Sequence, residues 1–244
     1  MGTQAPVVLV TGSSSGIGAA TAERFAREGA RLVINSSSSV DEGQALASSL
    51  DDAIYVQGNI AVEEDAKRIV ATAVEHYGGL DTLVNNAGTT EFIPHDDLDA
   101  VTDEVWQKIL GTNLLGTWYV SRAAVPSLRE RRGSIVNVTS IAGLIAGGSS
   151  LPYAVSKAAL NHLTRLLAAA LGPEVRVNAV APGLIETPWV QREGWEQIRA
   201  MVERRAALSR TGTPEDVAEV IWSLAQTSYV TGQVVVADGG VTLQ

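Results

Sequence analysis

TGSSSGIG at residues 11–18 follows a short apolar run, VVLV at residues 7–10, and leads into a helical pattern that continues through Glu28. Its three glycines permit a tight turn, a close approach of the backbone to a pyrophosphate, and close packing of a helix on a strand. The free N–H groups at the start of that helix favour an anion. The stretch therefore predicts a strand, a phosphate-binding turn and a helix, although its spacing differs from the general G-x-G-x-x-G fingerprint.

Short β-branched runs and longer helical segments alternate along the rest of the chain. Strands separated by helices imply a parallel sheet, and strands that are apolar almost throughout imply helices on both faces. Right-handed crossovers then give an α/β fold with a Rossmann-like, doubly wound, seven-stranded parallel sheet. The expected strands are 7–11, 31–35, 53–57, 80–85, 133–140, 175–180 and 233–237.

Neither a linker nor an internal repeat divides the 244 residues, so we expect one domain over 1–244 that both binds a dinucleotide and carries the reaction. The 27 acidic and 18 basic side chains give a net charge of −9, which opposes binding to nucleic acid or to anionic membranes. No cysteine is present, no run is long enough to span a membrane, and we expect no signal peptide, because only six residues precede the first apolar run. These features predict a cytoplasmic protein.

A dinucleotide-binding turn needs a side chain that selects the ribose substituent, about 20 residues further on at the end of the next strand. Here that segment reads Asn35-Ser36-Ser37-Ser38, and no carboxylate appears before Asp41. Amide and hydroxyl groups can donate to a 2′-phosphate whereas a carboxylate would repel it, so the segment favours NADP(H), with NAD(H) as the other cofactor. It contains no Arg or Lys, and a solvated turn of serines is the alternative interpretation.

Tyr153 and Lys157 stand four residues apart at the start of a predicted helix, which places both side chains on one face. A tyrosine that transfers a proton near neutral pH needs its pKa lowered from about 10 by roughly 2–3 units. A neighbouring cation can supply this, because two unit charges about 4 Å apart interact by about 4 kcal/mol at an effective dielectric of about 20. The pair predicts acid/base chemistry, although such a spacing also arises by chance on protein surfaces.

Two further polar residues support a catalytic interpretation. Ser140 follows a predicted strand at its carboxyl end, where open α/β sheets bind ligands, and its hydroxyl can hold a substrate oxygen. Asn113 lies in a helical segment weakened by Gly111 and Gly116, where its amide can bond a displaced backbone group or a water. The histidines have no ligand-like spacing, so we expect no metal site; they are His76, His95 and His162.

Taken together, these motifs resemble the short-chain dehydrogenase/reductase family in its short single-domain form. The resemblance spans almost the whole chain and rests on motifs in a fixed order. They are Thr11 to Gly18, Asn85-Asn86-Ala87-Gly88, Asn113, Ser140, Tyr153 with Lys157, Pro182-Gly183 and Asp238-Gly239-Gly240. Within the family, Asn35 with its serines and the ending from Val230 to Gly240 are most similar to the 3-oxoacyl-carrier-protein reductase-like branch.

The resemblance implies an oxidoreductase that interconverts a ketone and a secondary alcohol. Tyr153 would be the acid/base, Lys157 its pKa-lowering partner and a ligand of the nicotinamide ribose, Ser140 the donor to the substrate oxygen, and Asn113 the anchor of a relay water. Asn59 stands where the family usually has aspartate, which weakens the expected bond to the adenine. The implied cofactor-binding set is Gly12, Ser14, Ser15, Gly16, Ile17, Gly18, Asn35, Ser36, Ser37, Asn59, Ile60, Asn86, Ala87, Gly88, Tyr153, Lys157, Pro182, Gly183, Ile185 and Thr187.

Residues 188–210 are expected to form a lid over a small, apolar carbonyl or alcohol substrate, because apolar side chains recur in them and Gly194 allows a hinge. A helix packed on the core is the alternative, and it applies equally to Phe92, Ile93 and the stretch 141–145. The apolar side chains of the lid are Trp189, Trp195, Ile198 and Met201.

The helices near 103–125 and 154–171 carry small or apolar residues on nearly all faces, which indicates cover by the sheet and by a second subunit in a homodimer or homotetramer. A tight monomeric core is the alternative. Arg129, Arg131 and Arg132 complement the end of a helix, with a docking patch for an acidic carrier as the less favoured interpretation.

Two other functions compete with a reductase. A dinucleotide-binding sensor or scaffold would keep the fold without chemistry, but the four catalytic-type residues argue against it. A lyase or epimerase acting on a sugar nucleotide would use the same Tyr153 and Lys157 pair. The family branch with these activities usually has a longer C-terminal substrate domain than this sequence shows, which argues against it.

Overall fold

The computed structural model describes residues 5–188 and 195–243, and these form one domain around a seven-stranded, wholly parallel sheet. The strand order is β3-β2-β1-β4-β5-β6-β7, which confirms the predicted doubly wound sheet. Each strand begins and ends within two residues of its expected limits. The strands are β1 (Val7–Val10), β2 (Arg31–Ser36), β3 (Ala53–Gln57), β4 (Thr82–Asn85), β5 (Ser134–Val138), β6 (Arg176–Pro182) and β7 (Val234–Ala237).

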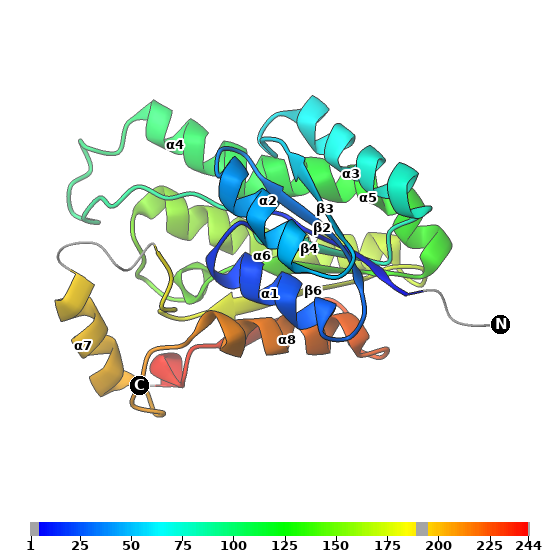
Figure 1. Ribbon diagram of the computed structural model, residues 1–244. Coiled ribbons are helices and arrows are strands. Elements are labelled where there is room, and N and C mark those ends of the chain that lie inside the picture. The colour runs from blue at the N-terminus through cyan, green and yellow to red at the C-terminus, as the bar shows by residue number, and fades with distance from the viewer. Residues whose placement is uncertain (1–4, 189–194, 244) are drawn as a thin grey trace.

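Helices cover both faces of the sheet (Figure 1). On one face lie α1 (Gly16–Ala26), α2 (Val40–Ser49) and α8 (Pro214–Gln226). On the other lie α3 (Glu63–Tyr77), α5 (Thr117–Arg131) and α6 (Leu151–Leu171). Within the described ranges, no helix has both the length and the apolarity that crossing a membrane requires.

The central strands are buried on both sides, which explains their continuous apolar sequences. In β1, the side chains of Val8 and Val10 pack toward α1 and α8, whereas Val7 and Leu9 pack toward α3 and α5. Each such side chain contributes roughly 1.5–3 kcal/mol relative to an exposed one. The sheet and its two helical layers therefore form a rigid support for the loops at its edges.

The chain reverses direction across the sheet between β1 and β4, which are neighbours although two strands separate them in sequence. At such a switch point the loops after the two strands separate and leave a crevice at the carboxyl edge. The helices α4 (Asp103–Leu110) and α7 (Trp195–Arg205) extend beyond the sheet at this edge (Figure 1).

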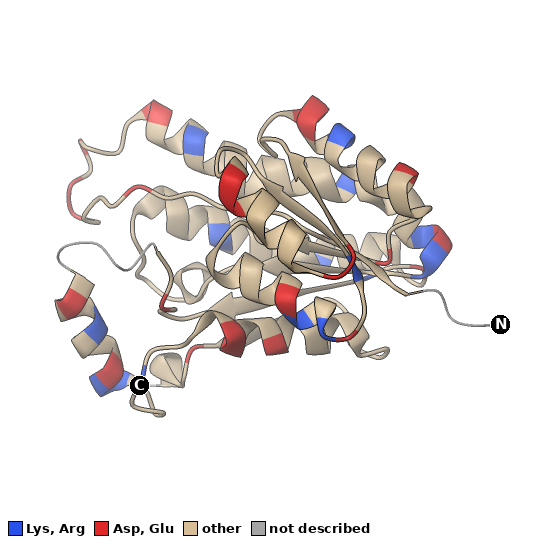
Figure 2. Cartoon of the chain, in the orientation of Figure 1, with Lys and Arg blue, Asp and Glu red and all other residues tan. Residues whose placement is uncertain are grey.

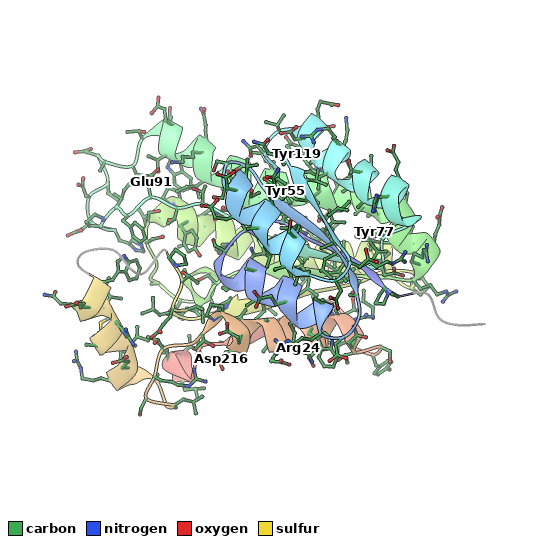
Figure 3. All side chains as sticks on the ribbon, viewed as in Figure 1. Arg24, Tyr55, Tyr77, Glu91, Tyr119 and Asp216 are labelled. Atoms are coloured by element: carbon green, nitrogen blue, oxygen red, sulfur yellow. The ribbon has the colours of Figure 1, made fainter. Side chains whose placement is uncertain are left out.

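One connection departs from the expected right-handed crossovers. β4, β5, β6 and β7 follow one another in the same direction across the sheet, yet α8 packs on the face opposite α5 and α6. The connection from β6 to β7 therefore has the opposite hand from those that precede it. Contacts of Arg24 of α1, labelled in Figure 3, hold α8 in place. Its Nε lies 2.6 Å from Glu219 Oε1, and its guanidinium lies 4.0 Å from the centre of the Trp222 ring.

The segment expected as one helix near 103–125 consists of three parts. α4 passes into one turn of π-helix, Gly111–Gly116, and then into α5, which continues past Pro126 to Arg131. The π-turn coincides with the two glycines that weaken the helix. α6 begins at Leu151, three residues earlier than expected, so Tyr153 lies in its first turn.

Candidate functional site

The turn after β1 has the geometry that its glycines predict. Gly12 and Gly16 have φ angles of +62° and +55°, in the left-handed region that favours glycine. A Cβ on Gly12 would lie 2.7 Å from the Cα of Ala87, so a side chain there would collide with backbone. Ser15 caps α1 without a side-chain hydrogen bond, which leaves the first N–H groups of the helix available for an anion.

A cavity of about 1170 Å³ extends along the carboxyl edge of the sheet from this turn to α7. It exceeds the usual 300–1000 Å³ of a small-molecule pocket, and its length suits a dinucleotide together with a substrate. The predicted residues that line it are Gly12, Ser14, Ser15, Gly16, Ile17, Asn35, Ser36, Ser37, Asn59, Ile60, Asn86, Ala87, Gly88, Ser140, Tyr153, Lys157, Pro182, Gly183, Ile185 and Thr187. Gly18 and Asn113 are the two predicted site residues that do not line it.

Gly18 has a packing role. A Cβ there would lie 2.4 Å from Gly12 O and 2.6 Å from Asn86 Nδ2. The Asn86 amide itself donates to Thr11 O at 3.0 Å and to Gly12 O at 2.9 Å. Gly18 thus lets the loop after β4 pack closely on the turn after β1, and its contact with a cofactor stays a prediction.

Asn113 is fully buried within the π-turn. Its Oδ1 accepts from the backbone N–H of Thr89 at 2.8 Å, and its Nδ2 donates to Thr89 O and to Ser156 Oγ, each at 3.0 Å. The amide therefore bonds a backbone group from another loop, one of the two uses expected of it. No side-chain donor remains for a relay water, so Asn113 fixes the loop that passes beside Lys157.

Tyr153, Lys157 and Ser140 meet in the middle of the cavity wall. The Lys157 ammonium lies 5.6 Å from the centre of the Tyr153 ring and donates to Val138 O at 2.9 Å. Ser140 Oγ bonds the Tyr153 hydroxyl and accepts from Ala142 N at 3.1 Å. Gly88 lies beside this group, since a Cβ there would lie 3.6 Å from Lys157 Nζ, an ordinary contact distance.

Burial dominates the ionisation of both groups. Desolvation raises the pKa of Tyr153, and the hydrogen bond with Ser140 opposes this increase. Desolvation also lowers the pKa of Lys157 to about 8. The side chains alone therefore keep Tyr153 protonated, and the expected lowering of its pKa requires positive charge beyond that of Lys157.

The segment after β2 is more internal than its sequence indicates. Asn35 Nδ2 donates to Val56 O at 3.0 Å and to Gly58 O at 3.1 Å, and Ser36 Oγ bonds Tyr55 OH at 2.8 Å. Both polar groups hold neighbouring strands together, so neither is free to donate to a 2′-phosphate as predicted. Ser37 and Ser38 are both exposed and line the cavity, so their hydroxyls are the accessible ones in this segment.

The side-chain amide of Asn59 is also partly used in a hydrogen bond with the backbone. Its Oδ1 accepts from Ala61 N at 3.0 Å, while its own backbone N–H donates to Asp65 Oδ2 at 2.8 Å. Arg68 reaches the same corner from α3, where it donates to Gln57 O at 2.9 Å. This cation is 31 residues beyond Ser37 in the sequence, so the local segment alone contained no signal for it.

Apolar side chains from three segments form one wall of the cavity. Phe92, on the segment after β4, packs edge-on against Trp195 of α7 with ring centres 5.1 Å apart. Ile93, Ile145, Ile198 and Met201 complete this wall. Trp195, Ile198 and Met201 therefore face the cavity instead of the core, whereas Trp189 and Gly194 lie outside the described residues. This half of the cavity suits an apolar substrate.

Charged side chains lie mainly on the outer helices (Figure 2). Arg129, Arg131 and Arg132 are at the end of α5, at the opposite edge of the sheet from the cavity (Figure 1). Arg131 donates to Gly78 O at 2.7 Å, and Arg132 is the left-handed residue that ends the helix. These contacts favour the helix-end interpretation.

Comparison with known proteins identifies the family. Residues 12–242 match a family profile described as enoyl-(acyl carrier protein) reductase. A protein of Streptomyces violaceoruber named as a ketoacyl reductase of the granaticin polyketide synthase is 56% identical over 242 residues, 98% of this chain and 97% of that protein. The 3-oxoacyl-[acyl-carrier-protein] reductase of Thermotoga maritima is 40% identical over 247 residues, 97% of this chain and 98% of that protein.

Solved structures agree with these relatives. A crystal structure from Burkholderia xenovorans, assigned to the short-chain dehydrogenases/reductases, matches with a TM-score of 0.91 and 36% identity over the full length of both chains. The order of the sequence motifs, the strand order and the sequence relatives lead to one conclusion: the chain belongs to the short-chain dehydrogenase/reductase family.

Proposed function

We propose that the chain reduces the 3-oxo group of an acyl thioester to a hydroxyl group, with NADPH as the hydride donor and Tyr153 as the proton donor. The observation that carries the proposal is the convergence of Tyr153, Lys157 and Ser140 in one cavity with the glycine turn. The names of the Streptomyces and Thermotoga relatives support a ketoacyl substrate.

The residues of the cavity divide the reaction between them. A bound nicotinamide would supply the hydride to the carbonyl carbon. Tyr153 donates its proton to the carbonyl oxygen, and Ser140 donates a hydrogen bond to the same oxygen. Lys157, protonated below about pH 8, stabilises the phenolate that remains, and it would hold the nicotinamide ribose. Asn113 acts as a positioning residue through the Thr89 backbone.

The polar groups along the cavity fit a dinucleotide. The N-terminus of α1, with Ser14, Ser15, Gly16 and Ile17, would hold the pyrophosphate. Asn59 and Ile60 would contact the adenine, and Ser37 the ribose substituent. The loop of Asn86, Ala87 and Gly88 would line the ribose side, and Pro182, Gly183, Ile185 and Thr187 the nicotinamide end.

A substrate panel tests this function directly. The oxidation of NADPH, and separately of NADH, would be followed at the nicotinamide absorbance with 3-oxoacyl thioesters, cyclic ketones, ketosteroids and sugar ketones. We expect the 3-oxoacyl thioesters to give the highest kcat/KM. A preference for one of the other carbonyl classes would reject the thioester assignment while keeping a carbonyl reductase.

An enoyl thioester belongs in the same panel because the matching profile is described as an enoyl reductase. Reduction of that substrate needs a proton on carbon, whereas Ser140 and Tyr153 are two neighbouring hydroxyls, which suit a carbonyl oxygen. Faster turnover of the enoyl than of the 3-oxoacyl thioester would reverse the assignment. Cofactor binding without turnover of any substrate would favour the non-catalytic alternative.

A further inference from the structure

Two hydroxyl groups from distant parts of the chain meet in the cavity wall. Thr90 Oγ1 and Ser149 Oγ are within hydrogen-bonding distance of each other, and both side chains are partly exposed and line the cavity. Thr90 lies on the segment after β4, and Ser149 lies in the loop before α6. The mechanism proposed above uses neither residue.

Both hydroxyl-bearing segments run beside the reacting groups. Ser149 stands four residues before Tyr153, and a Cβ on the neighbouring Gly148 would lie 3.6 Å from Tyr153 Cδ1. On the other side, Thr90 follows Thr89, whose backbone is held by the Asn113 amide. The pair is therefore fixed from two sides next to the catalytic tyrosine.

Joining the two loops does not require these hydroxyls. The backbone N–H of Ile93 already donates to Ser149 O at 2.9 Å and ties the same segments together. The surrounding wall is largely apolar, with Phe92, Ile145 and Trp195 among its side chains. A polar pair in such a wall is suited to a polar atom of the ligand, because a buried ligand oxygen without a partner would weaken binding.

The pair has enough hydroxyl protons to bond each other and also to donate to a ligand oxygen. The pair has two protons, one of which is used in the bond between Thr90 and Ser149. Thr90 also has the carbonyl of Glu91 as an acceptor at 3.2 Å. When Thr90 donates to Ser149, the proton of Ser149 is free to donate into the cavity, and the first bond polarises and strengthens the second.

We propose that Thr90 and Ser149 bind the thioester carbonyl oxygen of the substrate, and that they thereby select 3-oxoacyl thioesters over simple ketones. The inference rests on the proposed function. A 3-oxoacyl thioester has two carbonyl groups separated by one carbon. With the ketone oxygen on Tyr153 and Ser140, the Thr90 and Ser149 pair in the same cavity would bind the second oxygen, and the apolar wall would receive the rest of the acyl chain.

Two probes that differ by one oxygen test this inference. S-acetoacetyl-N-acetylcysteamine has both carbonyls, and its thioether analogue S-(3-oxobutyl)-N-acetylcysteamine keeps only the ketone. Dissociation constants would be measured by quenching of tryptophan fluorescence, with the NADPH complex in a Tyr153→Phe background to prevent turnover. Without further substitutions, we expect the thioester to bind about tenfold more tightly than the thioether.

Ser149→Ala and Thr90→Val, each in that background, are expected to remove this preference by weakening the thioester about tenfold and leaving the thioether within about twofold. Thr112→Val is the matched control, because Thr112 also lines the cavity but does not contact the pair. Equal weakening of both probes would show that the pair only joins two loops, and unchanged binding of both would show that it does not contact the substrate. Either result would overturn the inference.

These binding measurements do not depend on catalysis. If the protein without substitutions turns over no carbonyl compound, the proposed function fails, and the ratio of the two dissociation constants still reports on Thr90 and Ser149. When Tyr153 is intact, Ser149→Ala and Thr90→Val should raise the KM for the thioester more than they lower its kcat, since the second carbonyl does not react.

Discussion

Tyr153 is held in its protonated form by the residues around it, and this suits a reductase. Burial raises the pKa of its hydroxyl, while Lys157 donates to Val138 O instead of to the phenol. The tyrosine therefore begins a reduction with the proton that the alcohol product needs. The arrangement stabilises the acid, and the positive charges at the site become important as the phenolate develops.

Replacement of Tyr153 separates chemistry from binding. Tyr153→Phe is expected to lower kcat by about 10²–10⁴ because it removes only the general acid. The dissociation constant for NADPH, measured by fluorescence titration, is expected to change little, since the pyrophosphate turn is intact. A kcat near that of the unsubstituted protein would rule out Tyr153 as the proton donor.

The ionisation of Lys157 predicts the pH dependence of the reduction. Its pKa of about 8 lies below that of an ordinary lysine because burial disfavours the ammonium form. We expect kcat/KM to fall as pH rises through about 8, because the charge that stabilises the phenolate is lost. Lys157→Met should abolish this inflection and lower the rate at pH 7, and a flat profile in the unsubstituted protein would contradict the assignment.

Cofactor choice is expected to depend on Ser37, since Asn35 and Ser36 are engaged between strands. Ser37→Asp places a carboxylate at the accessible position, where it repels a 2′-phosphate and accepts from a ribose 2′-OH. The ratio of kcat/KM for NADPH to that for NADH should fall about tenfold or more. Ser48→Asp, at an exposed position of α2 that does not line the cavity, is the matched control, and an unchanged ratio for Ser37→Asp would move the selector elsewhere.

For single residues, the sequence predicts which residues lie close together at the site. It predicts less well which hydrogen-bond partners each side chain has. The spacing of Tyr153 and Lys157 is local, so a helical period suffices to pair them. The bonds of Asn35 and Asn113 join segments that are far apart in sequence, and nothing within either motif indicates that the amide is already satisfied. Thr90 and Ser149 escape prediction for the same reason.

Helix α8 illustrates an element whose limits follow from its sequence. Thr213 and Asp216 form a reciprocal cap, with Thr213 N donating to Asp216 Oδ2 at 2.8 Å, and Pro214 occupies the first helical position. For the π-turn between α4 and α5, the sequence offered only a weak indication, the helix-weakening Gly111 and Gly116. The position of α8 on the face of α1 was not predictable, because it depends on the Arg24 contacts and breaks the usual handedness.

The cap of α8 predicts a pH-dependent contribution to stability. Arg210 lowers the pKa of Asp216 to about 2, so its stabilising contribution is present above about pH 4 and is lost as pH falls toward 2. Asp216→Asn should reduce the free energy of unfolding at pH 7 by up to about 1 kcal/mol, given the exposure of the pair. Urea titrations should show this difference narrowing between about pH 4 and pH 3, and a difference that stayed constant over this range would contradict the assignment.

For the whole molecule, α6 presents an apolar stripe to its outer side. Val155 and Leu166 are 47% and 54% exposed, and because they are 11 residues apart, three helical turns, they face the same way. Leu115 of the neighbouring π-turn is 46% exposed. We expect this stripe to contact a second copy of the chain in a homodimer or homotetramer.

Light scattering after gel filtration measures this association. The protein should elute as a multiple of 25.6 kDa, and Leu166→Glu should lower the mass by burying a charge in the interface. Leu98→Glu, an equally large change at a 66% exposed position between β4 and α4, should leave the mass unchanged. A monomeric mass for the unsubstituted protein would favour the tight monomeric core instead.

The cavity draws its wall from nearly the full length of the chain, and this has a consequence during synthesis. Gly12 is made almost at the start, whereas Thr187 closes over Gly16, where a Cβ would lie 3.3 Å from Thr187 Cγ2, and Val241 lines the far end. At ribosomal rates of roughly 5–20 residues per second, the phosphate turn leaves the ribosome on the order of ten to forty seconds before its last neighbours. A nascent chain that stops before Thr187 therefore has an incomplete nucleotide pocket.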